Sequence, residues 1–202
     1  MKSSLLSLLA LILLCLTTEA SAAGTDTPIG DVSGKTIYRS AIEGKAGSEL
    51  ESAMRRLFVD VAISEHLRTH KKELEPSEAD IALVSSQIKA SMMQDPALAR
   101  MQRMDDAKAR SLAGILLTNI YIQRHIYQRF GGGRLLFQQA GVEAFDATRV
   151  MIEEFESQGK IKIFDPVLRA PMYAYWKRNN GVFITDKADI EAALDPTRFI
   201  AK

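Results

Sequence analysis

The chain has 202 residues, of which 47% are hydrophobic and 25% are charged, with 26 Lys and Arg against 25 Asp and Glu. This composition is typical of a folded globular domain and is too apolar for a disordered chain. The formal net charge of +1 argues against nucleic acid as a partner, because non-specific binding of a polyanion needs a strongly basic surface. The single Cys excludes an internal disulfide and any zinc site built from several Cys ligands.

Residues 1–22 have the pattern of a secretory signal peptide. A short basic start is followed by an almost unbroken apolar run, Leu5–Leu16, and then by an A-x-A cleavage site that ends at Ala22. The run is shorter than the roughly 20 residues of a transmembrane helix, so no stable membrane insertion is expected. Cleavage would remove Cys15 and leave a chain without thiols, which suits an oxidising compartment. We therefore expect an exported, soluble protein of the periplasm.

The remaining chain is predicted to be mainly α, with one or two short β-strands. Residues 23–47 are rich in Gly, Ser and Thr and are expected to be irregular, with a short strand at Lys35–Arg39. Residues 48–202 are expected to form one multi-helix domain, of which 166–202 are a C-terminal helical extension. Its apolar spacing predicts helices over residues 48–72, 77–92, 95–130, 134–140 and 142–158, and helices that begin at residues 166 and 186. Further short strands are expected at residues 160–164 and 182–184.

Local signals mark where these helices begin or bend. Ser48 and Glu51 have the spacing of a capping box, in which each side chain satisfies a free backbone N–H of the first turn. Ser77 and Asp80 repeat this arrangement before the second helix. Pro171 is expected to interrupt or bend the helix that begins at residue 166.

Four methionines lie close together between the second and third predicted helices: Met92, Met93, Met101 and Met104. Because Met is flexible and polarizable, they could line a groove that accepts apolar side chains of many shapes. Leu57 and Phe58 would be the helical residues that complete this groove. The alternative is that the methionines fill core space, since an apolar stripe with helical spacing usually faces the core.

Two of the three histidines suggest a metal site. His66 and His70 are four residues apart on a predicted helix and Glu73 is three residues further on, so the three side chains share one face. Two imidazoles and a carboxylate could hold zinc and leave one coordination position open. The order is not that of an H-E-x-x-H motif, and Lys and Arg neighbours suit an ordinary solvated helix, which is the alternative.

A Gly-rich loop suggests an anion site. The backbone N–H groups of Gly132 and Gly133 and the guanidinium of Arg134 could cradle an anion. The loop lacks the ending of a phosphate-binding loop, and the alternative is that its glycines only stop a helix. The carboxylates that could serve an enzyme beside it are Glu143, Asp146 and Asp165.

No set of residues in the sequence makes a convincing catalytic site. The chain lacks a G-x-S-x-G motif, a Rossmann glycine fingerprint and, after cleavage, a Cys nucleophile. Salt bridges along a helix explain Glu143 and Asp146 equally well. Tyr173, Tyr175 and Trp176 could line a groove, or they could anchor the C-terminal helix in the core. We therefore favour a role without catalysis and without a cofactor.

Four stretches carry a family resemblance. Residues 29–40 read IGDVSGKTIYRS, residues 54–67 form a basic and apolar helix, residues 74–81 read LEPSEADI, and residues 150–165 end in KIKIFD. In these stretches the chain resembles the N-terminal domain of SurA-type periplasmic chaperones, over residues 29–165. The resemblance implies a helical cradle that binds extended polypeptide by apolar contacts. The family's parvulin domain has no counterpart here, so prolyl isomerase activity is not expected.

The sequence thus favours an exported helical protein that binds unfolded polypeptide or a protein partner through an apolar groove. An anion-binding protein, a small-molecule-binding protein or a hydrolase-like enzyme that uses the loop Gly131–Arg134 is the alternative. A homodimer is a further option, because two copies could cover each other's apolar helix face.

Overall fold

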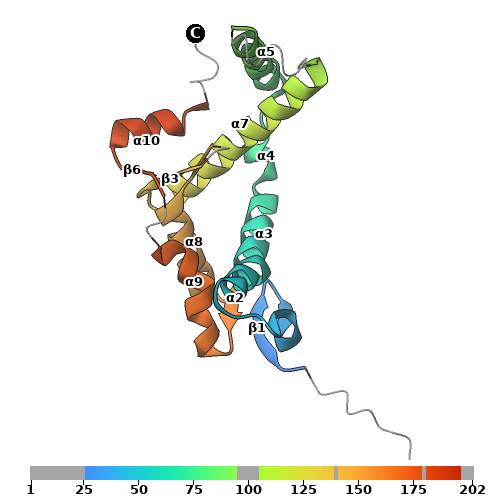
Figure 1. Ribbon diagram of the computed structural model, residues 1–202, viewed down its shortest axis with the longest axis vertical. Coiled ribbons are helices and arrows are strands. Elements are labelled where there is room, and N and C mark those ends of the chain that lie inside the picture. Colours follow the sequence, from blue (N-terminus) through green and yellow to red (C-terminus); the bar gives the residue numbers. More distant parts are fainter. Residues whose placement is uncertain (1–25, 95–104, 139–140, 179–180, 197–202) are drawn as a thin grey trace, which may run out of the picture.

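The computed structural model describes residues 26–94, 105–138, 141–178 and 181–196. Within these ranges the chain is mainly helical and contains two small three-stranded antiparallel sheets (Figure 1). The predicted mainly α fold is therefore confirmed. The predicted signal peptide lies outside the described residues.

The first sheet joins two distant parts of the chain. Strands β1 (Pro28–Val32) and β2 (Lys35–Tyr38) form a hairpin, and β5 (Ile161–Ile163) pairs with the other edge of β1. Ser33 and Gly34 make the two-residue turn with φ angles of 51° and 81°. Positive φ at both positions is typical of the tight turns that match the twist of a hairpin.

The region before the first long helix is more regular than its composition predicts. The expected strand near residues 35–39 is present as β2, but β1 was not expected, because Pro28 and Gly30 are poor strand formers. A 3-10 helix, η1 (Arg39–Ile42), follows the hairpin. The prediction of an irregular segment is therefore wrong for residues 28–32 and 39–42.

The helix predicted over residues 48–72 is present as four consecutive segments. They are α2 (Gly47–Met54), the π-helical turn η2 (Arg55–Asp60), α3 (Val61–Thr69) and α4 (Lys71–Leu74). The predicted capping box does not form, since Ala46 is the N-cap residue and no side chain caps the helix. The wider π turn changes the helical register, and Phe58 and Val59 are both buried there.

Helices α5 (Glu78–Gln94) and α7 (Asp106–Arg129) pack against each other as a hairpin. We call α5 and the facing part of α7, residues 106–117, the arm; in Figure 1, α5 lies at the opposite end of the molecule from the first sheet. The arm has its own small core of Val84, Ala113 and Leu117. The predicted start of α5 is confirmed, because the Asp80 N–H donates to Ser77 Oγ over 3.1 Å.

The second sheet replaces a predicted helix. Gly131, Gly132 and Gly133 have φ angles of 90°, 78° and 99°, which end α7 as expected. The chain then forms β3 (Leu135–Gln138), so the short helix predicted over residues 134–140 is wrong. A short apolar run fits a strand as well as a helix. Here β3 becomes a strand because it pairs with β4 (Gly141–Glu143) on one side and β6 (Phe183–Ile184) on the other.

The C-terminal helices agree with the predicted pattern in number and order. They are α8 (Phe145–Ser157), the 3-10 helix η3 (Pro166–Leu168), α9 (Arg169–Lys177) and α10 (Lys187–Ala193). Helix α8 starts three residues later than predicted, because β4 takes up the preceding residues. Pro171 lies in the first turn of α9, where a missing N–H is tolerated. The change from 3-10 helix to α-helix occurs before Pro171, between Leu168 and Arg169.

One main core holds the first sheet, α2, η2, α8 and α9 together. The largest fully buried side chains are mostly aliphatic, with two aromatic residues among them: Phe58, Phe155, Ile29, Met54, Leu117, Leu135, Met151, Ile152, Ile161, Met172, Val32 and Val59. All but one of these side chains belong to the main core, and the exception, Leu117, belongs to the arm. The arm is thus stabilised mainly by its own few apolar contacts.

Candidate functional site

All three histidines of the chain meet where α3 and α4 lie beside α7. One ring nitrogen each of His66, His70 and His125 lies within 4.8 Å of the other two. The Nε2 atoms of His66 and His125 are 3.2 Å apart. The sequence predicted Glu73 as the third member, and this is corrected: Glu73 Oε2 lies 4.0 Å from Nδ1 of His125, on the outer side of that ring. We call these three residues the histidine cluster.

The surroundings of the histidine cluster restrict how the rings can turn. The His66 residue is 8% exposed, and its ring centroid lies 5.5 Å from those of Phe130 and Phe155. The Nδ1–H of His70 donates to the backbone carbonyl of His66 over 2.9 Å. The Thr69 hydroxyl donates to the same carbonyl over 2.7 Å. Two of the rings are therefore held by packing or by a backbone hydrogen bond.

The electrostatics of the histidine cluster favour neutral rings. Burial and the neighbouring imidazoles of His70 and His125 lower the pKa of His66 from 6.5 to about 4. Burial and His70 also lower the pKa of His125, although Glu73 acts in the opposite direction. Both imidazoles are therefore neutral at pH 7 and keep a lone pair. The other charged side chains that influence the cluster are Arg129 and Lys160.

A groove of about 370 Å³ lies next to the histidine cluster. Apolar side chains from α3, α7 and β4 line it, and we call it the α7 groove: Ile63, Leu67, Ile122, Ile126 and Val142. Leu67 and Ile126 follow His66 and His125 directly in the sequence. The groove and the histidine cluster therefore both involve residues of α3 and α7. Polar side chains, among them Asp60, Gln123 and Thr148, line the rest of the groove, so its lining is mixed.

The apolar face of the α7 groove continues onto the arm. Leu112 and Ile115 are 38% and 64% exposed. Residues whose separations match whole turns of a helix share one side of it, so these two residues lie on the same side of α7 as Ile122 and Ile126. This side of α7 is therefore open to solvent on the arm and, beyond Asn119, half-buried at Ile122 and buried at Ile126.

A polar network forms one wall of the α7 groove. The Tyr175 hydroxyl donates to Glu143 Oε2 over 2.6 Å, and Gln138 Nε2 donates to the same oxygen over 2.8 Å. Burial raises the pKa of Glu143, while these hydrogen bonds act to lower it. The Arg55 guanidinium lies 5.0 Å from the centre of the Tyr175 ring. The wall thus combines an aromatic ring, a carboxylate and a cation.

Two polar atoms of groove-lining residues have no partner among the described residues. They are Asn119 Oδ1 and Trp176 Nε1, one acceptor and one donor, and both are buried. A buried polar group without a hydrogen bond costs roughly 1–3 kcal/mol. These residues therefore leave one buried acceptor and one buried donor without a hydrogen bond.

The structure describes only part of the methionine groove expected from the sequence. Met92 is half-buried and lies with Met93 in the last turn of α5, whereas Met101 and Met104 fall outside the described residues. Phe58 is 0% exposed and lies in the main core, so it cannot line an open groove. Leu57 is half-buried and packs against the same core. Both belong to η2 and not to the arm that carries Met92.

The Gly-rich loop binds an anion, but the anion is the chain's own carboxylate. The Arg134 N–H donates to Asp146 Oδ2 over 2.8 Å, and its guanidinium makes hydrogen bonds of 2.9 and 3.0 Å to the two carboxylate oxygens. These bonds lower the pKa of Asp146. A Cβ on Gly133 would lie 2.5 Å from Asp146 Cβ, while Gly132 lies against the Tyr127 ring. The loop Gly132–Arg134 is therefore not an open anion site.

The three carboxylates considered for catalysis do not meet. Glu143 bonds to Tyr175 in the α7 groove, Asp146 pairs with Arg134, and Asp165 accepts from Arg39 over 2.6 Å. Acid–base catalysis by two carboxylates needs both of them at one cleft. The structure does not bring these three together.

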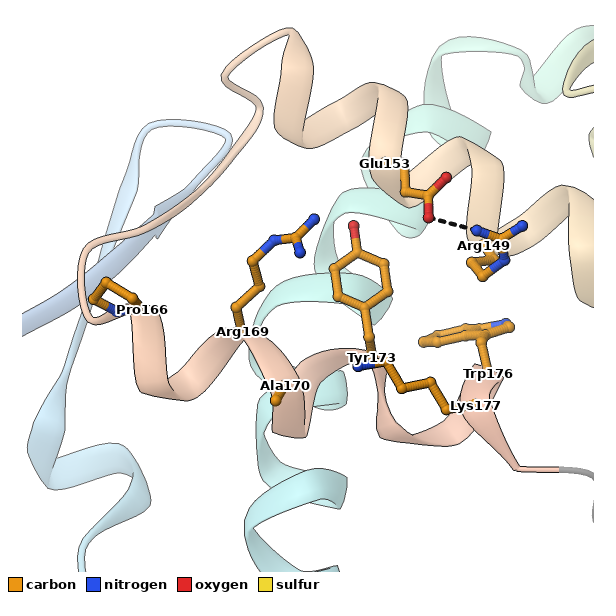
Figure 2. A pocket seen from close by; sticks show the side chains of 8 residues that line it. All are labelled: Arg149, Glu153, Pro166, Arg169, Ala170, Tyr173, Trp176 and Lys177. Carbon is orange, nitrogen blue, oxygen red and sulfur yellow. Dashed lines mark hydrogen bonds and ion pairs between the residues drawn. The ribbon is translucent and has the colours of Figure 1, made fainter.

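A second pocket, of about 490 Å³, lies between α8 and α9 (Figure 2). Figure 2 shows Arg149 paired with Glu153 on the α8 side, facing Tyr173 and Arg169 on the α9 side. Arg169 pairs with Glu156 over 2.9 Å, and the Tyr173 hydroxyl donates to the same carboxylate over 2.7 Å. Arg149 and Arg169 are therefore each paired with a carboxylate, and the lining also includes Lys177. Tyr173 is buried, as the core alternative predicted.

Comparisons of the chain with protein-family models, with curated proteins and with solved structures find no match. The resemblance to SurA-type chaperones therefore depends on the sequence stretches alone. Across the part of the chain that the structure describes, no helix combines the length and the hydrophobicity needed to cross a bilayer.

Proposed function

We propose that the chain is an exported, periplasmic, chaperone-like protein that binds extended segments of unfolded polypeptide in the α7 groove, without isomerase activity. The observation that carries this proposal is the largely apolar side of α7. It runs from the exposed Leu112 and Ile115 on the arm to the half-buried Ile122 in the groove, with Asn119 between them and Ile126 buried beyond. An exposed apolar face that leads into a groove is typical of a surface that binds other chains.

The dimensions of this face suit a short extended segment. From Leu112 to Ile126, helix α7 rises by about 21 Å, at 1.5 Å per residue. An extended polypeptide of roughly six residues has the same length. Burial of its side chains against aliphatic groups gives about 25 cal/mol per Å² of apolar area and depends little on sequence.

The polar wall of the groove suits the backbone of such a segment. An extended chain presents unpaired N–H and C=O groups along both edges. Glu143 can accept from such N–H groups, and Arg55 can donate to carbonyls, since both are only half-buried. The predicted signal peptide and the resemblance over residues 29–165 agree with this role.

The test is suppression of aggregation, with a matched pair of surface variants. The wild-type protein in several-fold excess should reduce the light scattering of a thermally unfolded model protein. Ile115→Asp, at a site 64% exposed, should weaken binding of a fluorescent unfolded peptide about tenfold, the equivalent of 1.4 kcal/mol. Val167→Asp, at a site 78% exposed in η3, introduces the same charge away from the groove and should leave binding unchanged.

Two results would contradict the proposal. Either the wild-type protein has no effect on aggregation at several-fold excess, or both variants lose binding equally. Sedimentation analysis tests the dimer alternative. A concentration-dependent dimer that Ile115→Asp disrupts would show that a second copy of this chain, and not a client, covers the face.

A further inference from the structure

Independently of polypeptide binding, we propose that His66, His70 and His125 together bind one divalent transition metal ion. Imidazole nitrogen is a preferred ligand of zinc, copper and nickel, and zinc is the ion with which we test the site. The ligands come from α3, from the residue between α3 and α4, and from α7. The ion would therefore connect two separate parts of the chain.

The distances between the ring nitrogens agree with a shared ion. In a tetrahedral zinc site with Zn–N bonds of 2.0–2.1 Å, two ligand nitrogens are about 3.3 Å apart. The Nε2 atoms of His66 and His125 are 3.2 Å apart in the structure. The His70 ring lies 4.4 and 4.8 Å, centroid to centroid, from the other two. One ring nitrogen of each histidine lies within 4.8 Å of the other two, so the His70 nitrogen has to move closer to reach the spacing of a bound ion.

A hydrogen bond on the far side of one ring and a nearby carboxylate on the far side of another direct the correct nitrogens inward. A metal-bound histidine usually donates its other ring N–H to a carbonyl or a carboxylate. His70 does so through Nδ1 to the His66 carbonyl, which leaves its Nε2 as the free ligand atom. Nδ1 of His125 faces the Glu73 carboxylate at 4.0 Å, which likewise leaves Nε2 for the ion. Glu73 thus has a positioning role and is not a ligand.

The environment of the histidine cluster also suits an ion with one open position. Phe130 and Phe155 pack against His66 and limit the access of water from the core side. Three protein ligands leave a fourth tetrahedral position for water or an anion. The cations Arg129 and Lys160 would favour an anion such as hydroxide there. At pH 7 the lowered pKa values of His66 and His125 mean that protons compete little for these nitrogens.

The same contacts could exist without metal, as a hydrogen bond between the Nε2 atoms of His66 and His125. The two states differ in a measurable way. In the metal-free state, Nε2 of either His66 or His125 carries the proton of this hydrogen bond. In the metal-bound state, none of the three ligand nitrogens carries a proton. Titration with metal therefore distinguishes them.

The experiment uses the full chain, purified without a polyhistidine tag, stripped with a chelator and titrated with zinc chloride in a calorimeter. We expect one zinc per chain. His125→Ala should weaken binding at least 100-fold, and Glu73→Gln about tenfold, through loss of ring positioning. Glu75→Gln changes an exposed carboxylate two residues away and should leave the affinity unchanged. Cobalt in place of zinc should give the visible absorption of a tetrahedral ion.

Absence of saturable one-to-one binding would overturn the proposal, as would equal affinity of the wild-type and His125→Ala proteins. Circular dichroism checks that each variant is folded. If His125→Ala is unfolded, the nitrogen NMR shifts of the wild-type imidazoles provide the second measurement. Zinc should then shift Nε2 of His125, and unchanged shifts of all three rings would refute the site. Neither result depends on peptide binding, so the two proposals succeed or fail separately.

Discussion

Protonation of His66 in the folded protein is unfavourable, because its ring is buried beside two other imidazoles. Its pKa is about 4 when folded against 6.5 for a solvated ring, so the unfolded chain binds the proton more readily. A lowered folded pKa means that this contribution to stability is complete above pH 6.5 and is lost as the pH falls toward 4. The difference corresponds to roughly 3 kcal/mol.

We therefore expect His66→Gln to lose less stability than the wild-type protein between pH 7 and about pH 4.5. Urea denaturation of metal-free protein at the two pH values measures this difference. Some pH dependence should remain in the variant, since the pKa of His125 is lowered as well. Parallel losses in the two proteins would show that another group controls acid stability in this range.

At the scale of single elements, Gly30 allows strand β1 to lie directly on the main core. A Cβ at this position would contact the Lys162 carbonyl oxygen and would lie 2.6 Å from Cε1 of Phe58, a ring that is completely buried. Neither the paired strand nor the ring can move away easily. Gly30→Ala should therefore destabilise the protein by about 1–3 kcal/mol.

Gly114 provides the matched comparison within helix α7. A Cβ there would meet only Ile81 Cδ1, at 4.0 Å, and alanine is the better helix former. Gly114→Ala should therefore stabilise its helix by about 0.5–1 kcal/mol. Urea denaturation of the Gly30→Ala and Gly114→Ala proteins should give shifts of opposite sign, and shifts of the same sign would contradict this account of the β1 packing.

The elements that could be predicted from the sequence are those whose ends carry local signals. Ser77 caps α5 and three glycines end α7, and each of these acts through neighbouring backbone. Strands β1 and β3 lack such signals. Each pairs with a neighbouring strand, β2 or β4, and also with a strand far away in the sequence, β5 for the first and β6 for the second, and local composition could not reveal these distant partners.

At the scale of the whole molecule, the candidate site depends on contacts that sequence spacing cannot show. Spacing correctly placed His66 and His70 on neighbouring turns, because that relation is local. His125 is 59 residues from His66 and joins the cluster only through the packing of α7 near α4. Likewise, the hydrophobic pattern predicts Phe58 as a groove residue, because the π turn that buries it leaves no signal in that pattern.

The division between arm and main core predicts that the molecule opens in two steps. The arm core contains Val84, Ala113 and Leu117, whereas the main core includes most of the buried residues described. Regions with few buried apolar contacts open locally at a lower free energy than the whole protein. Amide protons of α5 should therefore exchange faster than those of α8.

Two alanine variants test this separation. Leu117→Ala removes a fully buried side chain of the arm and should weaken it by about 2–5 kcal/mol. By hydrogen exchange, α5 and residues 106–117 should lose protection by a factor of roughly 30 or more, while α8 changes little. Met151→Ala, in the main core, should instead lower the protection of the slowest amides in α8. Equal changes throughout the chain in both variants would mean that arm and core unfold as one unit. The exposed face of α7 could then not adjust to a bound segment independently of the fold that supports it.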